Sequence, residues 1–121
     1  MECRIRYEPP DGTPTVSKEL QGTLIVGRDP GEDGITLSPL DQTISSRAVE
    51  LALENKQLVV RNTSTYAQID VQHNQGIRYL FPGEALRMSS SVTIVIPSEI
   101  YSHTIKVNVE GATETPVPSG D

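Results

Sequence analysis

Two arginines and several hydroxyl residues flank apolar runs in this sequence. Arg28 directly follows one apolar run, and Ser45, Ser46 and Arg47 precede a second run that begins at Val49. A guanidinium donates charge-assisted hydrogen bonds and hydroxyls donate neutral ones, so these residue types together could hold a phosphate group. Solvated arginines and turn-forming serines are the alternative interpretation of the same residues.

A third segment, Arg61 to Ala67, supplies further hydroxyls in the sequence RNTSTYA. We expect this segment and the two others to form loops at the ends of strands, where β-sandwiches usually carry their binding residues. The three segments together therefore define one candidate binding region.

The residues needed for other kinds of site are scarce. Only His73, His103 and Cys3 offer imidazole or thiolate ligands, and they are not spaced as a metal-ligand pair. A nucleophilic serine would need a histidine base, but we expect His103 in or beside an edge-like strand and His73 in a loop. The sequence predicts a protein that is not an enzyme and needs no cofactor or metal.

Charge and cysteine content limit the possible partners and compartments. The 121 residues include 16 acidic and 10 basic side chains, a formal charge of −6, which disfavours nucleic acid and anionic membranes as partners. Cys3 is the only cysteine and cannot form an internal disulfide. With no apolar stretch long enough to cross a bilayer, we expect a cytoplasmic protein without membrane insertion.

Short apolar runs with β-branched residues and intervening turns predict an all-β protein. Alternation is clearest at Val49, Leu51 and Leu53, which would share one face of a strand. The polar residues 54–57 predict an antiparallel hairpin between two runs. The simplest architecture is a β-sandwich. The predicted strands are Glu2–Tyr7, Leu24–Val26, Ile35–Leu37, Val49–Leu53, Leu58–Val60, Ile69–Val71, Ile77–Phe81, Ala85–Met88, Val92–Ile96 and Thr104–Val109.

The strands predict a single domain over residues 1–109. Residues 110–121 contain prolines and glycines and, apart from Val117, no large apolar residue. We expect them to form a disordered tail or linker, which suggests a module of a longer polypeptide.

Four short motifs lie along the sequence: Gly27-Arg28, Ser45-Ser46-Arg47-Ala48, Asn62-Thr63-Ser64-Thr65-Tyr66-Ala67 and Pro82-Gly83-Glu84. In this order they resemble the motifs of the forkhead-associated (FHA) family, and the resemblance covers residues 2–109. The family pattern is Gly-Arg, Ser-x-x-His, Asn or Asp before Ser-Thr/Ser-Asn-Gly, and Pro-Gly-Asp. The resemblance implies a β-sandwich of about eleven strands that docks phosphothreonine peptides on loops at one end.

By position in these motifs, the resemblance gives roles to individual residues. Arg28 and Ser45 would contact the phosphate, and Thr65 would supply a further hydroxyl. Ser46 would add a contact from the same loop as Ser45, and Arg47 would lie near the peptide.

Three residues depart from the family pattern. Ala48 replaces a histidine that braces the binding loops, so these loops need another support. Tyr66 replaces the asparagine that holds the peptide backbone in the family, and we count Tyr66 as the last residue of the predicted site. Ala67 replaces a glycine that shapes the loop.

Two functions follow from this mixture of matches and departures. The first is a phosphothreonine-binding adaptor in Ser/Thr kinase signalling, favoured by Arg28, Ser45 and Thr65. The second is a degenerate FHA domain that binds a protein, or a second copy of itself, without phosphate, favoured by Tyr66 and Ala67.

Overall fold

The computed structural model describes residues 2–10, 12, 14–31, 34–37, 44–99 and 102–110. These residues form eleven strands and no helix, which confirms the all-β prediction and the expected number of strands. The strands are β1 (Glu2–Tyr7), β2 (Val16–Glu19), β3 (Thr23–Gly27), β4 (Ile35–Thr36), β5 (Val49–Glu54), β6 (Gln57–Asn62), β7 (Ile69–His73), β8 (Gly76–Leu80), β9 (Ala85–Met88), β10 (Val92–Ile96) and β11 (His103–Glu110).

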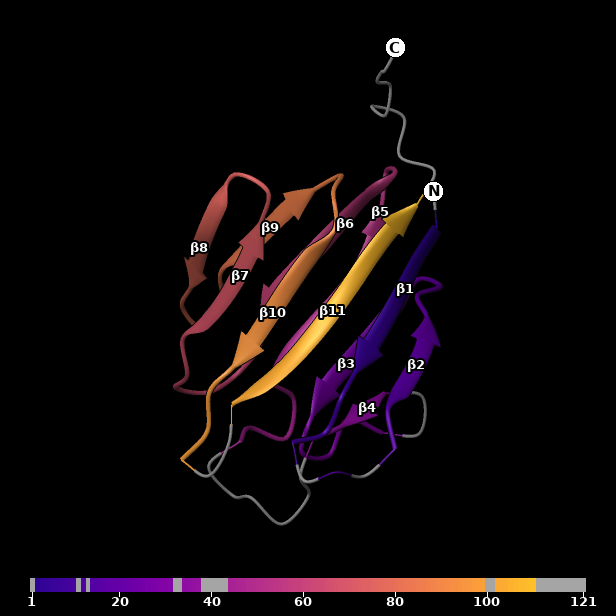
Figure 1. Ribbon diagram of the computed structural model, residues 1–121. Helices are drawn as coiled ribbons and strands as arrows, with labels where there is room; N and C mark the ends of the chain where they lie inside the picture. The colour runs from indigo at the N-terminus through magenta and orange to yellow at the C-terminus, as the bar shows by residue number, and fades with distance from the viewer. Residues whose placement is uncertain are drawn as a thin grey trace.

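The strands form the two layers of a sandwich (Figure 1). The six-stranded sheet has the order β2-β1-β11-β10-β7-β8, and the five-stranded sheet has the order β4-β3-β5-β6-β9. The first and last strands pair antiparallel, with Glu2 opposite Glu110. Glu2 and Glu110 mark one end of the sandwich. The ends of β3 and β6 and the start of β5 lie at the opposite end (Figure 1).

Alternating side chains build the core between the sheets. In β1 every second residue is buried, and in β11 the same alternation buries His103, Ile105 and Val107. The alternation predicted for Val49, Leu51 and Leu53 is confirmed, with Leu53 partly buried at the margin of the core. Each sheet therefore has a buried face and a more exposed face.

The two histidines lie in different places from those expected. His103 begins β11, an interior strand rather than an edge, and is fully buried with its Nδ1 atom 2.8 Å from the Tyr7 hydroxyl oxygen. β11 is the last strand of the chain, which made an edge position plausible. In the structure it lies between β1 and β10 and is therefore an interior strand. His73 is the last residue of β7 and not a loop residue.

The predicted hairpin joins β5 and β6, and its turn is shorter than expected. Glu54 pairs with Gln57, so only Asn55 and Lys56 form the turn. Both have positive φ angles, 52° and 62°. Such angles at both central positions are those of a type I′ turn, whose twist matches that of the flanking strands.

The short edge strand β2 was not predicted. Its sequence, VSKE, has one large apolar residue, Val16, which is only partly buried. At the other end of the chain, β11 continues to Glu110. The predicted tail starts at Glu110, which the structure instead places in β11, and the rest of it, residues 111–121, lies outside the described part of the chain.

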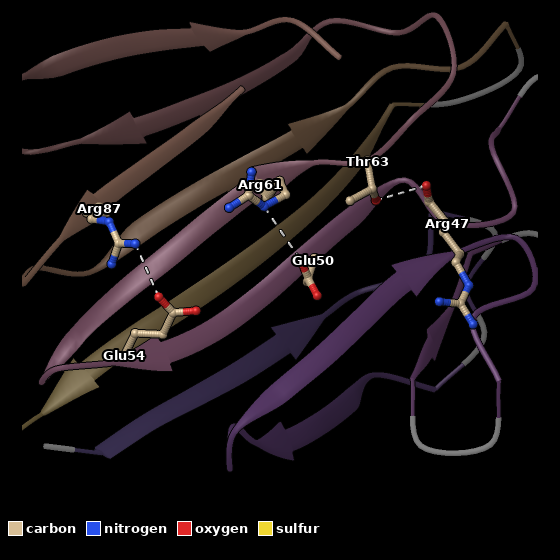
Figure 2. A network of polar contacts seen from close by, with 6 residues as sticks. All are labelled: Arg47, Glu50, Glu54, Arg61, Thr63 and Arg87. Atoms are coloured by element: carbon tan, nitrogen blue, oxygen red, sulfur yellow. Dashed lines mark hydrogen bonds and ion pairs between the residues drawn. The ribbon is translucent and has the colours of Figure 1, made fainter. Parts of the chain in front are cut away.

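Ion pairs cover the outer face of the five-stranded sheet (Figure 2). Arg61 Nε lies 3.7 Å from Glu50 Oε1, and Arg87 Nη2 lies 3.2 Å from Glu54 Oε1. The paired residues Ala52 and Val59 share this outer face, yet they are only 7% and 3% exposed. The charged side chains therefore shelter apolar ones, as the stems of long charged residues commonly do.

Candidate functional site

Gly27 permits the close contact on which the candidate site is built. A Cβ atom on this residue would lie 2.2 Å from the Ser46 carbonyl oxygen, so no larger residue fits without movement of the backbone. At this close approach the Arg28 amide donates to the Ser45 carbonyl, and the Asp29 amide donates to the Ser46 carbonyl, both at 3.0 Å. The Gly-Arg step thus joins the end of β3 to the loop before β5.

The side chain of Arg28 is held against the same loop. Its Nε donates to the Ile44 carbonyl at 3.0 Å, and its Nη2 donates to Ser46 Oγ at 3.1 Å. These contacts fix the plane of the half-buried guanidinium. The remaining N–H groups are available to an anion in a fork that suits phosphate oxygens.

Two hydrogen bonds connect the loop before β5 to the loop after β6. The Thr65 amide donates to Ser45 Oγ at 3.0 Å, and Thr63 Oγ1 donates to the Arg47 carbonyl at 3.0 Å (Figure 2). Because Ser45 Oγ accepts a bond here, its own O–H proton is free to be donated to a ligand. The two loops are thereby fixed relative to each other before any ligand arrives.

All six residues predicted for the site line one surface pocket of about 400 Å³. None of its described lining residues is acidic. The Arg47 guanidinium makes no hydrogen bond or ion pair with the described residues and points away from the Glu50–Arg61 pair (Figure 2). In a chain of charge −6, this pocket is a local positive region. The lining residues are Arg28, Ile44, Ser45, Ser46, Arg47, Thr63, Thr65 and Tyr66.

Arg61 lies outside this pocket. It is part of β6 rather than of the loop that follows, and its guanidinium pairs with Glu50 on the outer face of the sheet. The expectation that the whole segment from Arg61 to Ala67 would be a loop is therefore wrong for its first two residues.

A buried asparagine supports the loop after β6. Asn62 is fully buried, and its Nδ2 donates to the carbonyls of Ala67 and Leu80 at 2.7 and 2.8 Å. Its Oδ1 accepts from the Ser64 amide at 2.9 Å and from the Ser64 hydroxyl at 2.5 Å. Sequence reasoning gave Asn62 no role of its own, although its fixed place in the third motif was a signal for one.

Asn62 also anchors the Pro82-Gly83-Glu84 turn. Its backbone amide donates to the Glu84 carbonyl at 2.9 Å, and its carbonyl accepts from the Gly83 amide at 2.8 Å. The third and fourth sequence motifs therefore meet at one residue.

No family model and no curated protein matches this sequence. Solved structures do match. The FHA domain of a hypothetical protein of Arabidopsis thaliana is 16% identical, with a TM-score of 0.64 over 99% of this chain and 91% of that one. The N-terminal FHA domain of Saccharomyces cerevisiae Rad53p, in complex with a phosphothreonine peptide, is 13% identical, with a TM-score of 0.68 over 91% of this chain and 94% of that one. The FHA domain of CT664 from Chlamydia trachomatis is 16% identical, with a TM-score of 0.65 over 93% and 100%.

The chain has an FHA fold. Eleven strands in two sheets, the near-complete coverage and the agreement among several neighbours establish the architecture that the motifs predicted.

Hydrogen bonds of the backbone hold Ala48, where the resemblance expects a bracing histidine. Ala48 is buried, its amide donates to the carbonyl of Val26 in β3 at 2.8 Å, and its carbonyl accepts from the Thr63 amide at 3.0 Å. The bond from Thr63 and the Thr63–Arg47 bond tie the loop before β5 to the loop after β6.

The other two departures from the family pattern have different consequences for the candidate site. Tyr66 is 90% exposed at the edge of the pocket. Ala67 is not among the described non-glycine residues with positive φ, which are Asn55 and Lys56. The loop therefore does not require glycine at position 67, while Tyr66 presents an exposed aromatic ring at the edge of the pocket.

The described residues contain no cluster of three or more histidine, cysteine or acidic side chains that could hold a metal ion. That part of the FHA fold also lacks any helix with the length and apolar character needed to cross a membrane.

Proposed function

We propose that this chain is a phosphothreonine-peptide-binding adaptor, which recruits a protein phosphorylated by a Ser/Thr kinase, and not an enzyme. The observation that carries the proposal is the convergence of Arg28, Ser45, Ser46, Arg47 and Thr65 on one pocket, with no acidic side chain among its described lining residues. The neighbour from Saccharomyces cerevisiae, which shares the fold, is in complex with a phosphothreonine peptide.

The preformed geometry of the pocket supports a role in holding phosphate. Arg28 is already oriented by Ile44 and Ser46, so little of its side-chain freedom would be lost on binding. A phosphorylated residue carries nearly two negative charges and three strong acceptor oxygens, which match the unused donors of Arg28 and the nearby hydroxyls. The negative net charge means that this attraction must be local, which disfavours nucleic acid as a partner.

Phosphate-independent protein binding is the second candidate function, favoured by one observation. Tyr66 stands almost fully exposed where the family resemblance expects a peptide-holding asparagine. An exposed aromatic ring offers contact area to an unphosphorylated partner or to a second copy of the chain.

A cytoplasmic location and membership of a longer polypeptide form part of the proposal. The free, buried thiol of Cys3 suits a reducing compartment. The composition after residue 110 resembles that of a linker.

The decisive experiment compares a degenerate phosphothreonine peptide library with its unphosphorylated and phosphoserine counterparts. We expect capture of phosphothreonine peptides and little capture of unphosphorylated ones. Equal capture of phosphorylated and unphosphorylated peptides would favour the second function, and capture of neither would refute the adaptor role.

A further inference from the structure

Exposed apolar side chains gather along one edge of the molecule. Within the described residues, the exposed large apolar or aromatic side chains are Tyr66 at 90%, Ile77 at 52%, Tyr79 at 50% and Phe81 at 55%. Three of these lie in β8 or directly after it, and the fourth borders the candidate phosphate pocket. We call these four residues the apolar strip.

The strand pairing fixes the face on which the strip lies. Ile69 pairs with Leu80, and both are buried between the sheets. Side chains alternate along a strand, so Ile77 and Tyr79 project from the opposite, outer face of the six-stranded sheet. Because β8 ends the strand order of that sheet, it has no described strand on its other side (Figure 1).

Asn62 brings the strip and the phosphate pocket together. Its Nδ2 donates to both the Ala67 and the Leu80 carbonyls, so the residue after Tyr66 lies beside the residue before Phe81. From Phe81 to Ile77 the strand covers about 14 Å. That length corresponds to about four to five residues of extended peptide.

The size of the strip limits what can bind there. Four half-exposed or exposed side chains of this size offer on the order of 500 Å². Two copies pairing through the strip would bury about 1,000 Å², less than the roughly 1,200–2,000 Å² of a stable interface. A segment of a ligand that is already held at the phosphate pocket needs far less contact area on the strip. The stretch of ligand between the two contacts raises the local concentration of that segment.

We propose that the apolar strip docks a second segment of the same phosphorylated protein. That segment is extended, carries apolar side chains at alternate positions, and adds as a strand beside β8. Backbone hydrogen bonds to the free edge of β8 supply affinity, and packing on Ile77, Tyr79 and Phe81 supplies specificity. The inference rests on the proposed phosphothreonine binding, which tethers the segment through the pocket beside Tyr66.

The test uses two phosphothreonine libraries, one with only a few random residues around the phosphothreonine and one extended by about a dozen random residues on either side. We expect the long library to select Val, Ile, Leu, Phe or Tyr at alternate positions in its extension. Peptides made from those selections should bind about tenfold more tightly than their short versions. Burial of a small apolar area on the strip is enough to give a gain of this size.

Variants locate the effect on the molecule. The double change Ile77→Thr with Tyr79→Thr places residues of high strand propensity at both positions and should abolish the gain of the long peptides while leaving short-peptide affinity unchanged. Arg78→Thr is the matched control, because this residue lies between the two on the opposite face of β8. It should keep the gain.

A measurement on the unaltered protein does not depend on how the variants fold. Binding of a long peptide should slow hydrogen exchange of β8 amides, and binding of its short version should not. Equal affinity of long and short peptides, or unchanged exchange in β8, overturns the docking inference and leaves the phosphate pocket standing. Absence of phosphate-dependent binding in both libraries overturns both proposals. Dimerisation in sedimentation equilibrium that Tyr79→Thr abolishes would assign the strip to a second copy instead.

Discussion

Replacement of Arg28 by alanine tests the centre of the proposed site. Of the two guanidinium groups among the described lining residues, the change removes the one that Ile44 and Ser46 already orient. A charge-assisted hydrogen bond contributes about 1.5–3 kcal/mol, so loss of one such contact should weaken phosphothreonine-peptide binding about 10- to 100-fold.

The same substitution should change stability only modestly. It removes two partly exposed hydrogen bonds, from Nε to the Ile44 carbonyl and from Nη2 to Ser46 Oγ, together worth about 1–2 kcal/mol, which corresponds to roughly 4–12 °C in melting temperature. The backbone bond from the Arg28 amide to the Ser45 carbonyl remains. Calorimetric titration and thermal unfolding of the same samples separate the two effects.

Arg61→Ala provides the matched control for Arg28→Ala. It changes the net charge by the same amount, but it acts on an exposed pair with Glu50 outside the pocket. Such pairs contribute about 0–1 kcal/mol, so both affinity and stability should stay close to those of the parent. If Arg28→Ala lowered the melting temperature strongly and left affinity unchanged, Arg28 would be a structural residue and the proposed site would be wrong.

Four further predictions follow from the structure. Asn62→Ala should lower the free energy of unfolding by about 2–5 kcal/mol in urea, because the Ala67 and Leu80 carbonyls lose their buried donor. A loss below about 1 kcal/mol would contradict the bracing role of Asn62. Tyr66→Asn should raise the affinity for short phosphothreonine peptides up to about tenfold. Adding Ala67→Gly should give no further gain, because position 67 needs no positive φ. Weaker binding of the single variant would show that Tyr66 itself contacts the ligand. Phosphopeptide affinity should fall moderately with rising salt, since screening acts over about 8 Å at physiological ionic strength, and duplex DNA should compete poorly; tight DNA binding would refute the partner class. Burial raises the pKa of the Cys3 thiol, so thiolate-directed reagents should label it slowly in the native protein and quickly in denaturant, and rapid native labelling would show that β1 opens easily.

The sequence by itself determined most of the strands and the order of the site motifs. Alternation such as Val49, Leu51 and Leu53 is a local property, because the backbone places successive side chains on opposite faces of a strand whatever its neighbours are. The strand β2 was missed because the prediction depends on this local alternation. A half-exposed edge strand with one large apolar residue shows little of it. Six of the eight described residues that line the pocket were found from residue types and their order in the motifs, whereas Ile44 and Thr63 were not.

Only the tertiary structure decided which strands are neighbours and which contacts hold the loops. The position of His103 inside the sheet depends on the pairing of β11 with β1, from the opposite end of the chain. Asn62 braces the site through the Leu80 carbonyl, and Gly27 is required by the Ser46 carbonyl; both partners are distant in sequence. Likewise, residues 77–81 show the apolar character of a strand in the sequence, but the exposure of Ile77, Tyr79 and Phe81 follows from the place of β8 at the edge of its sheet. Periodicity predicts which side chains share a face, whereas burial and hydrogen-bond partners depend on chain segments that local sequence does not specify.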